Sequence, residues 1–189
     1  GTAIEALYGK LILRKKTRQL SQLYIHDSLT GLYNRMAYEK LALPLFQKCM
    51  DESRSVGILF IDADHLKYIN DNFGHDMGNL AIRSIASVIQ QQCPVNSVSM
   101  RYGGDEFVFG YEGDISKEEL DRKVKKVYDI LNKGYKRGDL LKNMSVPCSI
   151  GIVTAIGGSF DYAKLLKEAD NAMYDAKING KNTYVIREL

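Results

Sequence analysis

The chain has 189 residues, of which 45% are hydrophobic and 26% are charged, and its formal net charge is +3. This length suits one domain with a short flanking element, and the apolar fraction is sufficient for one hydrophobic core. A charge this close to neutral gives no indication of a nucleic-acid surface, and no apolar run is long enough to span a bilayer. We therefore expect neither a nucleic-acid partner nor direct membrane insertion of this chain. The three cysteines lack CxxC spacing, which favours buried free thiols.

Residues 1–25 predict a helix that leads into the domain. The apolar residues Ile4, Leu7 and Leu11 recur at helical spacing, and the charged residues of this stretch are mostly basic. The apolar stripe is too short to decide between two interpretations, a solvated helix and a signalling linker that pairs with its copy in a dimer. We expect a linker helix at 1–25 and a folded domain at 26–189.

Strand patterns begin in the middle of the chain. A continuous apolar run at 56–61 is typical of a central strand buried on both faces. Apolar residues alternate on either side of a glycine pair at 103–104, which predicts a hairpin. Two later runs predict strands at 146–153 and 183–186, and Gly151 in the first of them predicts close packing by another element.

Helix signals fall between these strands. Asn34, Ser116 and Asp161 are residues that cap helix N-termini, and apolar residues at helical spacing follow each of them. Another helical pattern covers about 82–89. Helices and strands in this order predict an α+β sandwich in which helices pack on a largely antiparallel sheet.

Two carboxylates directly follow the run at 56–61. If the chain stays extended, Asp62 and Asp64 point to the same side, into one mouth of the fold. Neighbouring carboxylates repel each other unless a cation lies between them, and oxygen ligands suit a hard divalent ion. The alternative is a polar loop that begins at the strand end.

The glycine pair is followed by two more acids, Asp105 and Glu106. Glycines allow a tight turn and the close approach of a phosphate to the main chain. The alternative is a solvent-facing turn, because these residue types are common there. On neighbouring strands, the two acidic features together predict a site for a metal ion and a phosphate.

Five motifs in chain order carry a resemblance to a known family. They are DSLTGLYNR at 27–35, DADHLKYIND at 62–71, FGHDMG at 73–78, RYGGDEF at 101–107 and ADNAMYDAKINGKN at 169–182. The chain from Ile25 to its C-terminus resembles the GGDEF-domain diguanylate cyclases. The resemblance implies a ferredoxin-like two-layer sandwich of the nucleotidyl-cyclase type. It also implies a nucleotidyltransferase that condenses two GTP into cyclic di-GMP, as a homodimer in bacterial second-messenger signalling.

The resemblance further implies roles for individual residues. Asp62, Asp105 and Glu106 form the reactive centre, and magnesium or manganese is held by Asp62, Glu106 and the carbonyl of Ala63. Asp105 belongs to the same cluster, as a metal ligand or as a base. The residues implied in binding phosphates are His65, Leu66, Lys67, Gly104, Lys177 and Lys181.

Asn70 and Asn79 stand where the family reads the guanine base. The usual residue at the second position is Asp, and a carboxylate accepts both guanine donors, whereas the amide of Asn79 offers one acceptor and one donor group. Two alternatives to cyclic di-GMP synthesis therefore stay open. One is a synthase with altered purine choice, and the other is a catalytically silent module that binds nucleotide or transmits dimerisation.

Regulation and location are also matters of expectation. Family members that are inhibited by their product carry RxxD upstream of the signature, and this chain has Pro94 and Ser97 at the Arg and Asp positions. We therefore expect no product site of that kind. We expect an upstream sensor in a longer parent protein and a cytoplasmic location, including that of the cytoplasmic part of a membrane-anchored sensor.

Overall fold

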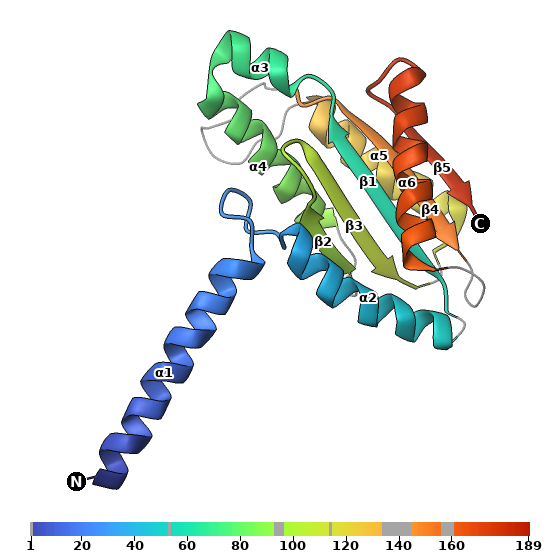
Figure 1. The fold of residues 1–189 in the computed structure, drawn as a ribbon. Coiled ribbons are helices and arrows are strands. Elements are labelled where there is room, and N and C mark those ends of the chain that lie inside the picture. The colour runs from blue at the N-terminus through green and yellow to red at the C-terminus, as the bar shows by residue number, and fades with distance from the viewer. Residues whose placement is uncertain (1, 53, 93–96, 114, 134–144, 156–160) are drawn as a thin grey trace.

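The computed structural model describes residues 2–52, 54–92, 97–113, 115–133, 145–155 and 161–189 (Figure 1). Two leading helices precede an order of β-α-α-β-β-α-β-α-β, as the sequence predicts. The elements are α1 (Thr2–Ile25), α2 (Arg35–Asp51), β1 (Val56–Ala63), α3 (Leu66–Phe73), α4 (His75–Gln92), β2 (Ser97–Arg101), β3 (Glu106–Glu112), α5 (Lys117–Lys133), β4 (Cys148–Ala155), α6 (Tyr162–Ile178) and β5 (Tyr184–Glu188).

The strands form one sheet in the order β2-β3-β1-β4-β5. β1 lies in the centre and pairs antiparallel with β3 on one side and β4 on the other. β2 and β3 form the predicted antiparallel hairpin, whereas β5 runs parallel to β4, to which α6 connects it. All eight residues of β1 are buried, which confirms the central strand predicted from its apolar run.

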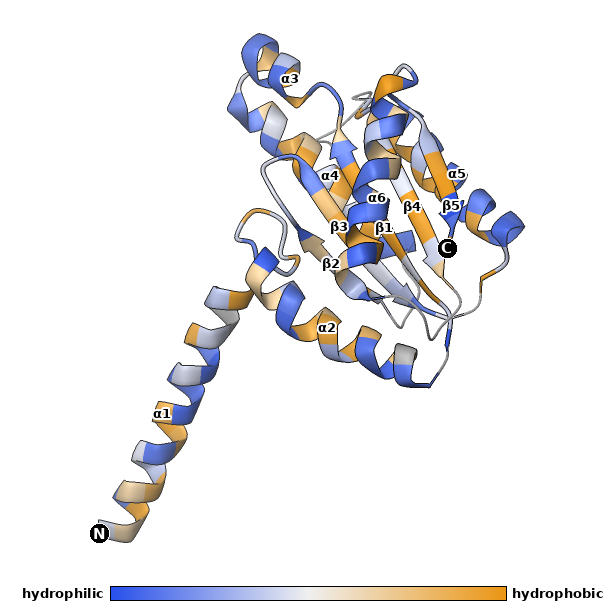
Figure 2. Ribbon diagram, turned by 45° about the vertical axis from the view of Figure 1, so that its right-hand side comes forward, coloured by the Kyte–Doolittle hydropathy of each residue, from blue (hydrophilic) through white to orange (hydrophobic). Residues whose placement is uncertain are grey.

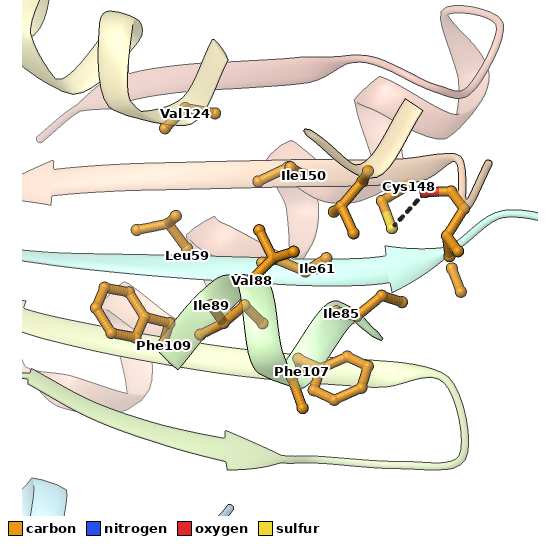
Figure 3. Close-up of a cluster of buried hydrophobic side chains, with 14 of the residues drawn as sticks. Leu59, Ile61, Ile85, Val88, Ile89, Phe107, Phe109, Val124, Cys148 and Ile150 are labelled. Carbon is orange, nitrogen blue, oxygen red and sulfur yellow. Dashed lines mark hydrogen bonds between the residues drawn. The ribbon is translucent and has the colours of Figure 1, made fainter. Parts of the chain in front are cut away.

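Helices cover both faces of the sheet. Alternate residues of β1 enter two separate cores, Leu59 and Ile61 in one, and Ile58 and Phe60 in the other. The first core is closed by α4 and α5, and Figure 3 shows residues of α4 packed across β1 and β3 in it. The second is closed by α2 and α6. The ferredoxin-like α+β fold is thus confirmed, and α2 and α6 add a helical layer to the predicted two-layer sandwich.

The close approach of α6 to β4 bears on the site. A Cβ on Gly151 would lie 2.1 Å from the backbone N of Met173 and 2.2 Å from the carbonyl of Ala169. Only a residue without a side chain fits there, so the predicted role of Gly151 is confirmed. The helix begins at Asp161, whose side chain caps it as expected. This packing brings the C-terminal turn of α6 to the end of the sheet where β1 finishes (Figure 1).

The predicted N-terminal helix is present as α1, 24 residues long, which projects from the domain (Figure 1). Hydrophilic and hydrophobic residues alternate along its whole length (Figure 2). Many of its large apolar side chains are exposed, and Ile4 is the most exposed of those described, at 77%. Among the described residues, no helix combines the length and apolar character needed to cross a membrane. Cys49 and Cys148 are free and buried, as expected, and Cys93 lies outside the described residues.

Candidate functional site

The two acidic features of the sequence meet at the end of β1. Asp62 is the Cα partner of Glu106 in the antiparallel β1–β3 ladder. The next residue, Ala63, donates its backbone N–H to the carbonyl of Asp105 over 3.1 Å. The structure therefore brings Asp62, Ala63, Asp105 and Glu106 together at one sheet edge, at adjacent positions of neighbouring strands.

Arg101 holds the glycine turn beside this edge. Its Nη2 and Nε donate to the carbonyl of Gly104 over 2.7 and 3.2 Å, and its Nη1 donates to Asp27 over 3.2 Å. Asp27 in turn accepts hydrogen bonds from the backbone N–H and the hydroxyl of Thr30, at 2.8 and 2.7 Å. Two motifs 74 residues apart in the chain thus form one rigid unit.

Asp62 is a carboxylate with an unusual environment. Its side chain forms an ion pair with Nζ of Lys177, from the last turn of α6. Burial raises the pKa of Asp62 to about 6, and the charges of Asp105 and Glu106 add to the increase, while the hydrogen bond and charge of Lys177 oppose it. Its Oδ1 is buried and has no hydrogen-bond partner in the described structure. A buried carboxylate oxygen of this kind is stabilised by a cation.

The neighbouring charges respond to the same cluster. Burial raises the pKa of Glu106, and Asp105 and Asp170 raise it further, against Lys177 and Arg35. Burial by itself lowers the pKa of Lys177, but the hydrogen bond and charge of Asp62 outweigh this effect and the pKa is raised. The site is therefore rich in negative charge, and it already attracts the positively charged side chain of Lys177.

Sequence reasoning gave no role to two of these residues. Asp170 adds negative charge near Glu106, and Arg35 adds positive charge there while its guanidinium lies 4.2 Å from the ring centroid of Tyr102. Both residues stand inside the motifs at 27–35 and 169–182. Their position in those motifs could have marked them as candidate site residues. That they lie near Glu106 is visible only in the folded structure.

The donor atoms suit a hard divalent cation, but they do not form a complete cage. No group of three or more His, Cys, Asp or Glu side chains suited to a metal ion occurs among the described residues. Carboxylates from adjacent strands and the carbonyl at the end of β1 are oxygen donors, which magnesium prefers, usually alongside waters and substrate phosphates. The unpartnered Oδ1 of Asp62 fits such an ion.

Asp64 is used differently from Asp62. The strand ends at Ala63, so the chain turns before the second carboxylate. Asp64 accepts hydrogen bonds from the hydroxyl of Ser149 and from the backbone N–H of Asn182, the latter at 2.7 Å. The sequence predicted that Asp62 and Asp64 point into one mouth of the fold, and the charges of both act on Lys177. They differ in their partners, because the carboxylate of Asp64 is hydrogen-bonded to β4 and to the loop after α6.

The expected phosphate-binding residues surround the same edge. His65 occupies the N-cap position of α3 without a side-chain cap, and Leu66 and Lys67 lie in the first helical turn. Helix geometry supplies no carbonyl partner for the N–H groups there, which favours an anion. The remaining three residues come from two other segments. Gly104 is exposed in the hairpin turn, Lys177 lies in the last turn of α6, and Lys181 is exposed in the loop that follows this helix.

Asn70 and Asn79 come from consecutive helices that pack together. A Cβ on Gly78 would lie 1.8 Å from Oδ1 of Asn70, so the Asn70 side chain rests on the Cα of the residue before Asn79. Asn79 is exposed, in the first part of α4. The structure therefore brings the two predicted base-reading residues together. Of the positions that would hold RxxD, Ser97 begins β2 and Pro94 lies outside the described residues.

Comparisons with known proteins identify the family to which the chain belongs. The family described as "Diguanylate cyclase, GGDEF domain" matches residues 24–183. The probable diguanylate cyclase DgcC of Escherichia coli K12 is 32% identical over 170 residues, which cover 90% of this chain and 45% of DgcC. The bifunctional diguanylate cyclase/cyclic di-GMP phosphodiesterase MucR of Pseudomonas aeruginosa is 32% identical over 182 residues, 93% of this chain and 25% of MucR.

These relatives are longer, since the chain spans 25% to 45% of their length. Among solved structures, the coiled coil and GGDEF domain of DgcB from Caulobacter crescentus, in complex with c-di-GMP, superposes with a TM-score of 0.86. It is 22% identical, and the match covers 99% of this chain and 97% of that one, so it supports the fold, including the leading helix. On the family match, the acidic edge and the fold, the chain belongs to the GGDEF domain family of diguanylate cyclases.

Proposed function

We propose that this chain condenses two molecules of GTP into cyclic di-GMP and two pyrophosphates, acting as a homodimer. The observation that carries the proposal is the β1–β3 register, in which Asp62 is paired with Glu106 beside the turn anchored by Arg101. Membership of the diguanylate cyclase domain family supports the substrate and the product. The site holds one nucleotide per chain, and two chains must face each other because each 3′-hydroxyl attacks the other nucleotide.

Some of these residues bind the phosphates of the nucleotide, and others act on the reacting atoms. The N-terminal turn of α3, with His65, Leu66 and Lys67, and the backbone of Gly104 bind phosphate oxygens. Lys177 and Lys181 bind the outer phosphates as point charges. Asp105 lies in the acidic cluster as a metal ligand or as the base that accepts the proton of the 3′-hydroxyl.

A magnesium or manganese ion, held by Asp62, Glu106 and the carbonyl of Ala63, would neutralise charge on the triphosphate and the leaving pyrophosphate. The ion pair of Asp62 with Lys177 supports this assignment, because it places positive charge against the same carboxylate. Removing either Asp62 or Glu106 would leave the ion with only one of these two carboxylate ligands.

Base recognition favours a second candidate function. The Asn70 side chain lies against Gly78, the residue before Asn79, and an amide at position 79 leaves one of the guanine donors poorly paired. The same amide pairs with the donor and acceptor edge of adenine. We therefore propose relaxed purine choice, with GTP preferred by less than a carboxylate at this position would give.

The proposal also covers the linker helix, the upstream sensor and the location of the domain in the cell. Residues 1–25 form a linker that transmits the state of an upstream sensor, and 26–189 form the catalytic domain. The DgcB fragment described as a coiled coil and GGDEF domain supports this division by analogy. The domain acts in the cytoplasm, either free or as part of a membrane-anchored sensor.

The experiment measures pyrophosphate release with magnesium and separates the products made from GTP, from ATP and from their mixture. We expect cyclic di-GMP from GTP, and no product above background from Asp105→Ala or Glu106→Ala. Glu118→Ala, an exposed acid at the start of α5, is the control and should match the unmodified protein. Nucleotide binding without any pyrophosphate, at concentrations where the protein is dimeric, would contradict the proposal and favour a silent module.

A further inference from the structure

The loop after α6 holds non-glycine residues in a backbone conformation that such residues rarely adopt. Three successive residues have positive φ angles, 108° at Gly180, 63° at Lys181 and 47° at Asn182. Glycine adopts this region freely, but lysine does so rarely, because its Cβ approaches the following carbonyl. Such a conformation persists only where surrounding contacts impose it. This loop carries Lys181 and follows directly on Lys177, the two lysines of the proposed phosphate site.

Two hydrogen bonds hold the loop in this shape. The N–H of Lys181 donates to the carbonyl of Ala176 over 3.1 Å, which ties the loop to the end of α6. The N–H of Asn182 donates to Oδ2 of Asp64 over 2.7 Å, which ties it to the end of β1, 118 residues away in the sequence. Of the two, only the second links the loop to the strand that carries Asp62.

Asp64 is itself held in place. Its backbone N–H donates to the carbonyl of Pro147 over 3.0 Å, and its Oδ1 accepts the hydroxyl hydrogen bond of Ser149, which is fully buried in β4. Both carboxylate oxygens therefore have partners within the protein. Asp64 therefore links the end of β1 to β4 and to the α6–β5 loop.

We propose that Asp64 is a positioning residue that sets Lys181, and through the loop the end of α6 with Lys177, at the site of the nucleotide phosphates. This inference rests on the proposed function. It assigns the two acids that follow the buried strand to different tasks. Asp62 pairs with Lys177 and would hold the cation, whereas Asp64 acts through hydrogen bonds that need an acceptor and no negative charge.

That difference makes Asp64→Asn the decisive substitution. An asparagine has the same shape, its Oδ1 can accept from the N–H of Asn182, and its amide group can donate to the hydroxyl oxygen of Ser149. We expect Asp64→Asn to retain the affinity for GTP in the presence of magnesium within about twofold. Asp64→Ala removes the anchor and should raise the dissociation constant roughly tenfold. Asp62→Asn, in the same strand end, loses affinity because its charge is required.

Amide hydrogen exchange of the segment 179–183 supplies a readout that does not depend on nucleotide. Exchange should be faster in Asp64→Ala and unchanged in Asp64→Asn. Adding Asn182→Gly to Asp64→Ala should recover part of the lost affinity, since glycine adopts the positive φ without an anchor. Ser149→Ala keeps the bond to Asn182 but removes one of the contacts that hold Asp64, so exchange in this segment should fall between that of the unmodified protein and that of Asp64→Ala.

The two measurements separate the failure of this inference from that of the proposed function. If the unmodified protein binds no GTP, the proposed function is wrong, and the exchange data still decide whether Asp64 orders the loop. If Asp64→Asn weakens GTP binding tenfold or more, the charge matters and the positioning role is overturned. It is also overturned if Asp64→Ala leaves both exchange and affinity unchanged.

Discussion

At the scale of single residues, Asn79 decides how well guanine is distinguished from adenine. It lies exposed near the start of α4, beside the Asn70 side chain that rests on Gly78. A carboxylate there would accept both the N1–H and the N2–H of guanine with charge assistance. The amide satisfies one of them, and the cost of a poorly paired donor is about 1–3 kcal/mol.

Asn79→Asp should therefore raise the affinity for GTP by roughly 5- to 150-fold, and leave that for ATP unchanged or lower. The substitution should not destabilise the fold, because an acid near a helix N-terminus interacts favourably with the helix dipole. Calorimetric titration of both variants with GTP and ATP, under magnesium, measures the two affinities. Equal ratios of GTP to ATP affinity in the two variants would contradict a base-reading role for position 79.

The charge of Asp27 contributes to the stability of the fold and takes no part in the proposed reaction. Burial by itself raises the pKa of Asp27, but the hydrogen bonds from Thr30 and the charge of Arg101 lower it below its ordinary value of 3.8. A carboxyl whose pKa is lower in the folded state stabilises that state above the unfolded pKa. This stabilisation is lost as the pH falls through the lowered folded value.

Asp27→Asn should accordingly lower the free energy of unfolding at pH 7 by about 1.5–3 kcal/mol, the range for hydrogen bonds to a charged group. The difference between the two variants should shrink as the pH falls from 4 toward 3. Urea unfolding at pH 7 and at pH 3 measures it. A difference that stays constant over this range would show that the charge of Asp27 is not what holds Arg101 and the glycine turn.

At the scale of elements, the contact between α3 and α4 places the Asn70 side chain against Gly78. A Cβ on Gly78 would come within 1.8 Å of Oδ1 of Asn70. The atom in the way is the end of a flexible side chain, so Asn70 can rotate aside at little cost to folding. Its rotation would remove it from the base site.

Gly78→Ala should thus weaken GTP binding roughly tenfold while the stability of the domain stays equal or rises by up to about 1 kcal/mol, since alanine favours helix over glycine. Gly9→Ala in α1 is the matched control, because a Cβ there meets nothing within 4 Å. It should leave GTP affinity unchanged. Thermal unfolding and titration with GTP separate the two effects, and loss of stability in Gly78→Ala would mean that Asn70 is fixed by more than this contact.

The elements themselves were largely predictable from local patterns. The apolar run of β1 and the caps at Asn34 and Asp161 specify elements through residues a few positions apart. The contacts that join distant motifs were not predictable in this way. The bond from Arg101 to Asp27, the ion pair of Lys177 with Asp62 and the bond from Asn182 to Asp64 depend on how the sheet and α6 are assembled.

The candidate site shows the same division. The acids at the end of β1 and after the glycine pair could be placed together, because the end of one strand and the start of an antiparallel neighbour lie at the same end of the sheet. The different use of Asp64 could not, since it depends on the strand ending at Ala63 and not one residue later. The second helical layer was also missed, because a helix that covers one sheet face has the same apolar periodicity as a helix that covers the other.

At the scale of the whole molecule, the proposed chemistry needs two chains, and α1 is the element that can bring them together. It extends away from the domain (Figure 1). Ile4, Leu7 and Leu11 on it are exposed. Ile4, Leu7 and Leu11 recur at intervals of three and four residues, which places them on one side of the helix. Leu13 lies on roughly the opposite side, two residues further along.

Leu11 and Leu13 therefore make a matched pair for testing how the chains associate. Their exposures are 56% and 66%, so a charge at either position disturbs the isolated chain to a similar extent. Burying a leucine contributes about 1.5–3 kcal/mol per side chain, and a symmetric dimer buries it twice. Leu11→Glu should weaken dimerisation tenfold or more and lower the rate of pyrophosphate release at low protein concentration, whereas Leu13→Glu should change neither.

Sedimentation measures the association of the chains, and the dependence of turnover on protein concentration measures its effect on activity. Equal effects of the two substitutions would show that α1 does not pair through the Ile4, Leu7 and Leu11 stripe, and the two active sites would then have to meet through the domains alone.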